Sequence, residues 1–233
     1  MKNQRIKILD TIRGISIIAM IVHHIMFDLE FMMGVTIPLF HGVLMDILQF
    51  IFIFLFIAIS GICCNFSKSN IKRGLMVFAF GIIITLVTYF FDRDLTVRFG
   101  ILHFLGISMI LYGLFEKVIS KINYKIQLVI FPILYTLSDI ILKKINPIGI
   151  CFLFPLGFYD KYFSSGDYFP LLPYIFMFFF GGAVGYFIKE NKFPKWFYSF
   201  DIPFFSFVGK YTLWVYLIHQ PILYGIMYVV SLI

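Results

Sequence analysis

The chain has 233 residues, of which 61% are hydrophobic and 13% charged, and it includes 32 Phe and 14 Tyr. A soluble domain is nearer to about 45–50% apolar and about 25% charged. A fold of this size has too little interior to hide so many apolar side chains, so lipid must be the solvent for much of its surface. The composition therefore excludes an ordinary soluble domain.

Seven apolar runs follow one another along the chain. Each approaches the ~20 residues that a helix needs to cross roughly 30 Å of hydrocarbon, and backbone groups in lipid are best satisfied within a helix. The runs lie at about 12–29, 47–64, 74–91, 99–115, 126–142, 169–188 and 211–233. The first run carries His23, His24 and Asp28 and lacks a small-x-small cleavage site, so it is not a signal peptide. We predict one domain over residues 1–233, an all-α polytopic membrane bundle of about seven transmembrane helices.

The Lys and Arg residues indicate the orientation, because cytosolic loops carry an excess of positive charge. Fourteen fall on the side of the N-terminus: Lys2, Arg5, Lys7, Arg13, Lys68, Lys72, Arg73, Lys117, Lys121, Lys125, Lys189, Lys192, Lys195 and Lys210. Five fall on the other side: Arg93, Arg98, Lys143, Lys144 and Lys161. We therefore expect a plasma-membrane protein with a cytosolic N-terminus and an extracytoplasmic C-terminus. Loops facing an anionic leaflet explain the net charge of +7 without a nucleic-acid partner.

Two other features bear on class. The three cysteines, Cys63, Cys64 and Cys151, have neither disulfide nor metal-ligand spacing, so we expect no metal. The longest extracytoplasmic connection, 143–167, contains a short apolar stretch at 148–159 that is broken by proline. That stretch is too short to span and is interpreted as re-entrant or surface-lying.

Polar groups inside a bilayer are costly and are candidates for function. Arg13 and His24 are eleven positions apart, so they differ by roughly 20° around a helix and by roughly 16 Å along it, whereas His23 points about 100° away. A cation at the cytosolic mouth suits a phosphate-bearing ligand, and a deeper imidazole on the same face suits proton transfer. The structural alternatives are that Arg13 is a positive-inside anchor and that His24 is a hydrogen-bonding contact between helices.

A second histidine, His219, lies near the middle of the last span, next to Gln220 and Pro221. We expect His24 and His219 to share one site, although two unrelated, satisfied histidines remain the alternative. On the outer side, Arg98, His103, His41, Asp46, Asp160 and Asp167 are candidates to line a vestibule for a polar acceptor. A rim ion pair between Arg98 and Asp94 is the alternative there. Gly181, Gly182 and Gly185 have the small-x-x-x-small spacing of close helix packing, not that of a phosphate loop.

Several of these residues resemble a known family. Leu9-Asp10-Thr11-Ile12-Arg13-Gly14 followed by His24 resembles the first-helix signature of membrane acyltransferases, an Arg, ten residues and a His. The whole chain resembles the bacterial relatives of the heparan-α-glucosaminide N-acetyltransferase catalytic domain. The matching segments are 5–28, 54–64, 98–103, 167–185 and 209–224, the last with a Tyr-Leu-Ile-His-Gln-Pro core.

The resemblance implies transfer of an acyl group, expected to be acetyl, from cytosolic acetyl-CoA to a sugar amine or hydroxyl of a glycan or glycolipid on the far face. It implies that Arg13, with Asp10, holds the CoA, and that His24 or His219 acts as general base or carries the acyl group. His41 would correspond to a lumenal-side histidine that is important in the animal enzyme. Acceptor binding would fall to Arg98, His103, Gln220 and Asp167. The expected partners also include the lipid bilayer and a second copy in a homodimer.

Two other classes of function stay open. A small proton-coupled transporter would use the midplane histidines as a relay, but it has no use for a CoA-sized cytosolic mouth. A structural or assembly membrane protein would tolerate polar substitutions at His24 and His219. Assay of the purified protein with labelled acetyl-CoA discriminates between these classes.

Overall fold

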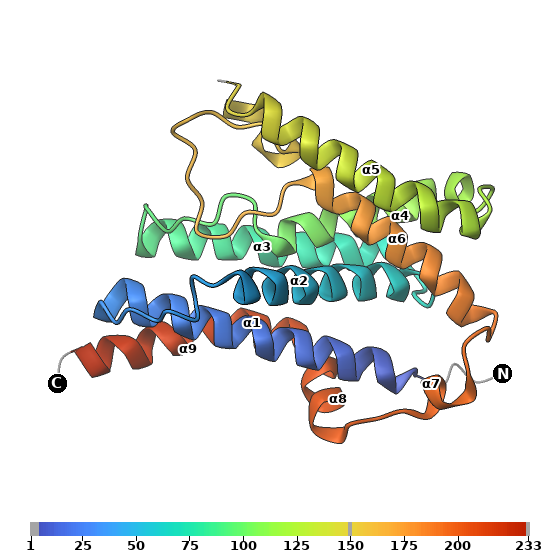
Figure 1. The fold of residues 1–233 in the computed structure, drawn as a ribbon, viewed down its shortest axis with the longest axis horizontal. Helices are drawn as coiled ribbons and strands as arrows, with labels where there is room; N and C mark the ends of the chain where they lie inside the picture. The colour runs from blue at the N-terminus through green and yellow to red at the C-terminus, as the bar shows by residue number, and fades with distance from the viewer. Residues whose placement is uncertain (1–4, 149–150, 232–233) are drawn as a thin grey trace. The chain divides into compact units, whose positions relative to one another are not determined.

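A computed structural model describes residues 5–148 and 151–231 of the chain. Within those residues, seven helices are long and apolar enough to cross a membrane. They are α1 (Lys7–Met33), α2 (Val43–Cys64), α3 (Asn70–Phe91), α4 (Ile101–Ile119), α5 (Tyr124–Ile145), α6 (Leu171–Lys189) and α9 (Thr212–Ser231), shown in Figure 1. The predicted all-α polytopic fold is therefore confirmed, and the chain is a multi-pass membrane protein.

The helix ends follow local chemistry more than hydropathy. The first helix is longer than predicted at both ends, and it stops at Gly34, whose positive φ of 66° is a backbone state that glycine adopts readily. Ser69 caps α3 by accepting the N–H of Lys72, and Asn123 caps α5 by accepting that of Lys125. Hydropathy detects only the lipid-facing part of a helix, so the predicted spans left out the polar residues of the first turns.

Much of the helical surface is exposed and apolar. Along α3, the side chains of Leu75, Ile83, Val87 and Phe90 are exposed and recur at intervals of eight, four and three residues. Such spacing places them on one face of a helix. A continuous apolar face of this kind is expected where lipid, not water, is the solvent.

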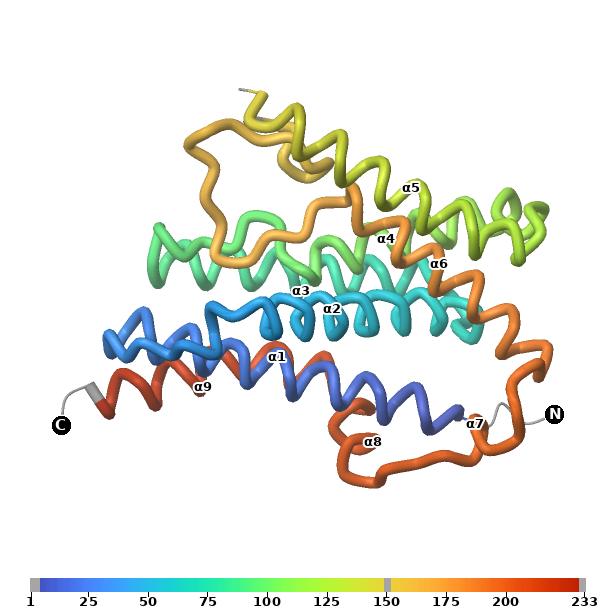
Figure 2. The backbone as a smooth tube through the Cα atoms, viewed as in Figure 1, coloured from blue at the N-terminus to red at the C-terminus, as the bar shows by residue number. Residues whose placement is uncertain are grey.

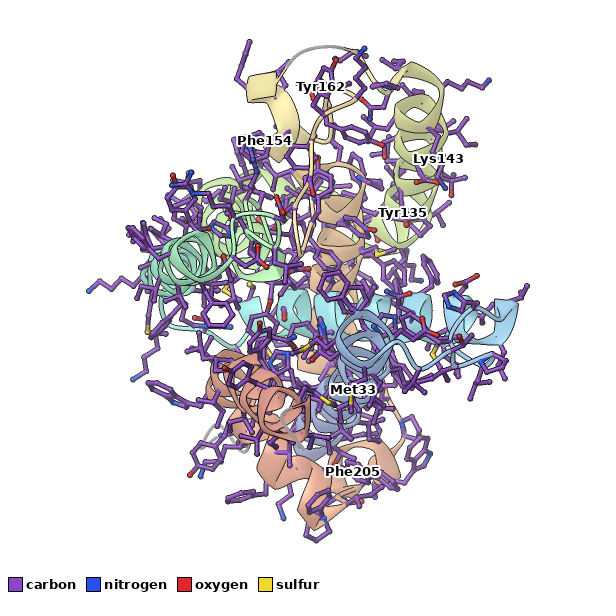
Figure 3. The ribbon with its side chains drawn as sticks, turned by 90° about the vertical axis from the view of Figure 1, so that its left-hand side faces the viewer. Met33, Tyr135, Lys143, Phe154, Tyr162 and Phe205 are labelled. Carbon is purple, nitrogen blue, oxygen red and sulfur yellow. The ribbon has the colours of Figure 1, made fainter. Side chains whose placement is uncertain are left out.

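The chain divides into two compact units, residues 1–56 with 193–233, and residues 57–192. In the first unit, α9 runs beside α1, and two short helices, α7 (Lys195–Ser199) and α8 (Pro203–Lys210), lie along the start of α1 (Figures 1 and 2). A Cβ on Gly209 would come within 1.8 Å of the Asp10 carbonyl oxygen, and one on Gly14 within 2.0 Å of that of Phe205. These two glycines let the backbones of α1 and α8 touch. Phe205 is labelled on α8 in Figure 3.

In the second unit, α3 packs on α4 and α5 on α6. A Cβ on Gly181 would meet the Ala58 carbonyl oxygen at 2.0 Å, and one on Gly61 would meet that of Phe178 at the same distance. The glycines of the sixth span therefore serve close helix packing, as their spacing predicted. The Tyr112 ring, 1% exposed, fills the space beside Gly182, and its hydroxyl donates to Asn65.

The connection between α5 and α6 forms a short 3₁₀ helix, Cys151–Leu156. The predicted re-entrant or surface-lying stretch, 148–159, is partly outside the described residues, at 149–150. The N–H of Phe169 donates to the Phe99 carbonyl, which ties the end of this connection to the start of α4. Tyr135 and Lys143, labelled in Figure 3, both project from α5.

Candidate active site

Two imidazoles, one from each end of the chain, meet in the first unit. The ring centroids of His24 on α1 and His219 on α9 are 5.2 Å apart. His219 is buried, with 8% of its surface exposed. The 3.6-residue period of α1 directs His24 toward α9, since α1 and α9 run side by side (Figure 1). The structure thus brings together the two histidines that the sequence placed at similar depth.

The nitrogens of His219 have different surroundings. Nδ1 lies 2.6 Å from the carbonyl oxygen of Tyr216, one turn earlier in α9. A carbonyl only accepts, so Nδ1 carries the proton and Nε2 of the neutral ring carries a lone pair. Nε2 is buried and has no hydrogen-bond partner among the described residues. The helix therefore presents a fixed, unsatisfied proton acceptor beside His24.

A second polar pair lies one residue further along α9 and one turn further along α1. The side-chain amide of Gln220 donates to both carboxylate oxygens of Asp28, at 3.1 Å each. Asp28 is 4% exposed. Asp28 follows His24 by four residues, so the two side chains lie roughly 40° apart around α1 and share a face. The ring contact of His24 with His219 and the hydrogen bonds of Asp28 with Gln220 therefore link α1 to α9 at two neighbouring levels.

His23 faces elsewhere. Its side chain makes a hydrogen bond with Gln49 of α2. Its ring centroid is 5.0 Å from that of Phe40. This agrees with the roughly 100° rotation between consecutive helical residues, which takes His23 off the face of Arg13 and His24.

Arg13 belongs to a charged cluster near the start of α1. Its Nη1 donates to Asp10 Oδ1 at 3.2 Å and lies 3.5 Å from the Gly209 carbonyl oxygen. Arg5 also pairs with Asp10, donating through Nε and, at 3.0 Å, through Nη2. Two guanidinium groups thus share one carboxylate, which leaves the cluster of Arg5, Asp10 and Arg13 with one positive charge in excess. Asp10 orients Arg13, and the excess charge suits an anionic ligand.

His41 lies in the turn between α1 and α2. Its Nε2 is 2.8 Å from Glu30 Oε2, and most of its side chain is exposed. Its ring stacks edge-on with that of Phe40, 5.4 Å away between centroids. The structure therefore places His41 with Glu30 and not in direct contact with His24 or His219.

The second unit holds the other predicted acceptor-binding residues. His103 Nδ1 accepts from the Gly100 N–H at 3.3 Å, and its Nε2 is 3.2 Å from Thr85 Oγ1. Asp167 Oδ2 accepts from the N–H of Ile101 at 3.0 Å. Both side chains thus satisfy the free N–H groups at the start of α4, which favours a structural role. Arg98 is exposed, and its backbone N–H donates to Ser165; among the described ion pairs none joins it to Asp94.

The described residues contain no group of three or more His, Cys, Asp or Glu side chains placed to hold a metal ion.

The family model described as the heparan-alpha-glucosaminide N-acetyltransferase catalytic domain matches residues 5–221, nearly the whole chain. The chain belongs to this family. Searches of curated proteins and of solved structures find no match. The family is one of membrane acetyltransferases.

The sequence did not single out the contact of Asp28 with Gln220 or the ion pair of Arg5 with Asp10. Asp28 stands at the i+4 position from His24, and Gln220 follows His219, so the spacing alone would have placed the two pairs on matching turns. The pairing itself depends on how far α9 is displaced along α1, which no periodicity reports. Arg5 lies before the first apolar run, so it was counted only among the positive charges that indicate the orientation.

Proposed function

We propose that this protein transfers an acetyl group from cytosolic acetyl-CoA to an amine or hydroxyl of a sugar, on a glycan or glycolipid at the extracytoplasmic face of the plasma membrane. Membership of the N-acetyltransferase family supports the reaction class. The excess of Lys and Arg on the side of the N-terminus supports the sidedness.

The observation that carries the proposal is the lone pair of His219 Nε2, which is buried, unsatisfied and adjacent to the ring of His24. A neutral imidazole in that tautomer is a general base. Nε2 takes a proton from the acceptor as its nitrogen or oxygen attacks the thioester carbonyl. The carbon–sulfur bond then breaks, and the CoA thiolate recovers that proton from the imidazolium. One proton thus passes from the acceptor through His219 to the CoA thiolate.

We assign the donor to the end of α1 that carries Arg13. The guanidinium groups of Arg5 and Arg13, which Asp10 orients, would contact the CoA phosphates. Eleven residues of helix separate Arg13 from His24, roughly 16 Å, and the flexible arm between the nucleotide and the thioester of CoA bridges that interval. His24 then contacts the thioester, and His41, held by Glu30, is assigned to the acceptor side.

The direct test is incubation of the purified protein in detergent with labelled acetyl-CoA and a panel of amino sugars and neutral sugars. We expect acceptor-dependent release of CoA and recovery of the label on the sugar. A protein that moves protons in vesicles but never consumes acetyl-CoA would instead be the transporter.

The sidedness needs its own test. Single cysteines at Lys121→Cys and Lys161→Cys, introduced after Cys63, Cys64 and Cys151 are replaced, lie in connections assigned to opposite faces. An impermeant maleimide added to intact cells should label position 161 and not position 121. Labelling of both positions from outside would contradict the assigned direction of transfer.

A further inference from the structure

Asp28 is a buried carboxylate without a counter-ion. It lies within α1, is 4% exposed, and forms no ion pair with any Lys, Arg or His in the part of the chain that the structure describes. Its hydrogen bonds come from the neutral amide of Gln220. A buried charge is costly unless it is paired, and ionisable groups inside spans usually face a partner or a ligand. A carboxylate at this position needs a proton or a cation to balance it, and none of the described Lys, Arg or His side chains supplies the cation.

The neighbouring groups point to the same kind of ligand. Because Gln220 turns its NH₂ group to Asp28, its Oε1 faces the other way, where it is buried and has no hydrogen-bond partner among the described residues. His219 Nε2, on the preceding residue, is also a buried acceptor with its lone pair open. Three adjacent groups thus accept hydrogen bonds, and one of them is anionic. A ligand that satisfies them must donate several hydrogen bonds and carry positive charge, as a primary ammonium group does.

The order of residues along α1 agrees with this. From the end that carries Arg13, the helix presents His24 and then, one turn further on, Asp28. A donor entering at Arg13 reaches His24 first, and Asp28 lies beyond it on the same face. Asp28 is therefore on the side from which the acceptor would approach.

We propose that Asp28, held by Gln220, binds the ammonium group of an amino-sugar acceptor and takes its first proton. This inference rests on the proposed acetyl transfer for its place in the reaction. The ammonium gives one proton to the Asp28 carboxylate and becomes a neutral amine. The amine then attacks the thioester and gives its second proton to His219 Nε2, and the thiolate takes that proton. One amide bond forms, one thioester bond breaks, and the proton on Asp28 leaves to solvent.

The test measures sugar binding, which needs no turnover. Glucosamine, glucose and N-acetylglucosamine are titrated by calorimetry against the full-length protein in detergent, with Asp28→Asn as the variant. A hydrogen bond to a charged group contributes about 1.5–3 kcal/mol, so we expect glucosamine to bind the wild type roughly 10- to 100-fold more tightly than glucose. Asp28→Asn should lose that preference. Asp139→Asn, a carboxylate of α5 that pairs with Lys143 at 2.8 Å, is the matched control and should keep it.

A second measurement covers the case in which Asp28→Asn does not fold. Dicyclohexylcarbodiimide modifies carboxyl groups in apolar surroundings, and mass spectrometry locates the adduct. In the wild type, glucosamine should protect Asp28 from modification several-fold, whereas glucose should not. Equal protection by the two sugars, or equal binding of the two by the wild type, overturns the inference.

The outcomes separate this inference from the proposed function. Preferential glucosamine binding that depends on Asp28, in a protein that never consumes acetyl-CoA, would leave the inference standing and refute the transfer reaction. Acetyl transfer with an unchanged sugar preference in Asp28→Asn would do the reverse.

Discussion

His219 in the first unit and His103 in the second are both buried imidazoles within apolar helices, with 8% and 5% of their surfaces exposed. Both ring nitrogens of His103 have partners: Nδ1 accepts from the Gly100 N–H, and Nε2 donates to the Thr85 hydroxyl, which in turn donates to the Val97 carbonyl. His219 bonds to backbone groups of Tyr216 and Val215, and its Nε2 has no hydrogen-bond partner among the described residues. The residue type and the burial are the same, and only the hydrogen bonding differs.

We propose that this difference separates a structural polar group from a reactive one. The imidazole of His103, whose two nitrogens both have hydrogen-bond partners, stabilises the start of α4. An unsatisfied one is costly to bury and is retained where a ligand completes it. The same contrast exists between carboxylates, since Asp167 accepts from a helix N–H whereas Asp28 has no ion pair among the described residues.

The largest expected effect is at His219. His219→Ala removes the proposed base, and general base catalysis contributes about 10²- to 10⁴-fold, so kcat should fall by that factor in the acetyl-transfer assay. Donor affinity should change little, because Arg13 and Asp10 are untouched. His23→Ala is the control and should be mild, since His23 bonds to Gln49 instead.

His24→Ala should also lose most activity, and the pair His23→Ala and His24→Ala is best measured in one assay. An essential His23 beside a dispensable His24 would mean that the reacting groups meet on the other face of α1. The contrast between His219, with its unsatisfied nitrogen, and His103 would then not identify the reacting side chains.

The next effect is on donor binding. Arg13→Ala should weaken acetyl-CoA binding by about 10- to 100-fold, the range for loss of one hydrogen-bonded charge, with little change in the unfolding temperature. Arg13→Lys should restore part of the affinity, because an ammonium keeps the charge but lacks the planar fork. Calorimetry measures both, with Arg93→Ala as a control outside the cluster. Unchanged affinity in Arg13→Ala would return Arg13 to the role of a topological anchor.

The sequence predicted the fold well because lipid imposes a simple rule. Each span must be apolar over about 20 residues, so all seven were found, whereas α7 and α8 were missed because short helices between spans obey no such length rule. The site was only partly predictable. Helical phase indicated that His24 and not His23 shares a face with Arg13, but whether His103 is open or satisfied depends on Thr85 and Gly100, which only tertiary packing brings to it.

A moderate effect is expected at His103. His103→Ala leaves the Gly100 N–H without its acceptor and the Thr85 hydroxyl without its donor, which should cost about 1–3 kcal/mol of unfolding free energy. Unfolding in detergent by increasing denaturant measures this. If His103 binds the acceptor instead, the variant should raise the KM for the sugar and leave the unfolding transition where it was.

The smallest effect is expected at Asp201, a carboxylate that lies outside the spans and already has hydrogen-bond partners. Asp201, just before α8, accepts from Lys7 Nζ at 2.7 Å and from the Ser206 hydroxyl, and these two donors hold the pKa of Asp201 below its usual range. A depressed pKa means that the folded state prefers the carboxylate, so its stabilising effect is complete above about pH 4, the unfolded value, and is lost as the pH falls through the folded value. Asp201→Asn should therefore unfold at a slightly lower temperature than the wild type at pH 6, and the gap should narrow as the pH falls below about 4. A gap that stays constant over that range would show that the hydrogen bond to Ser206, and not the charge, holds α8 to α1.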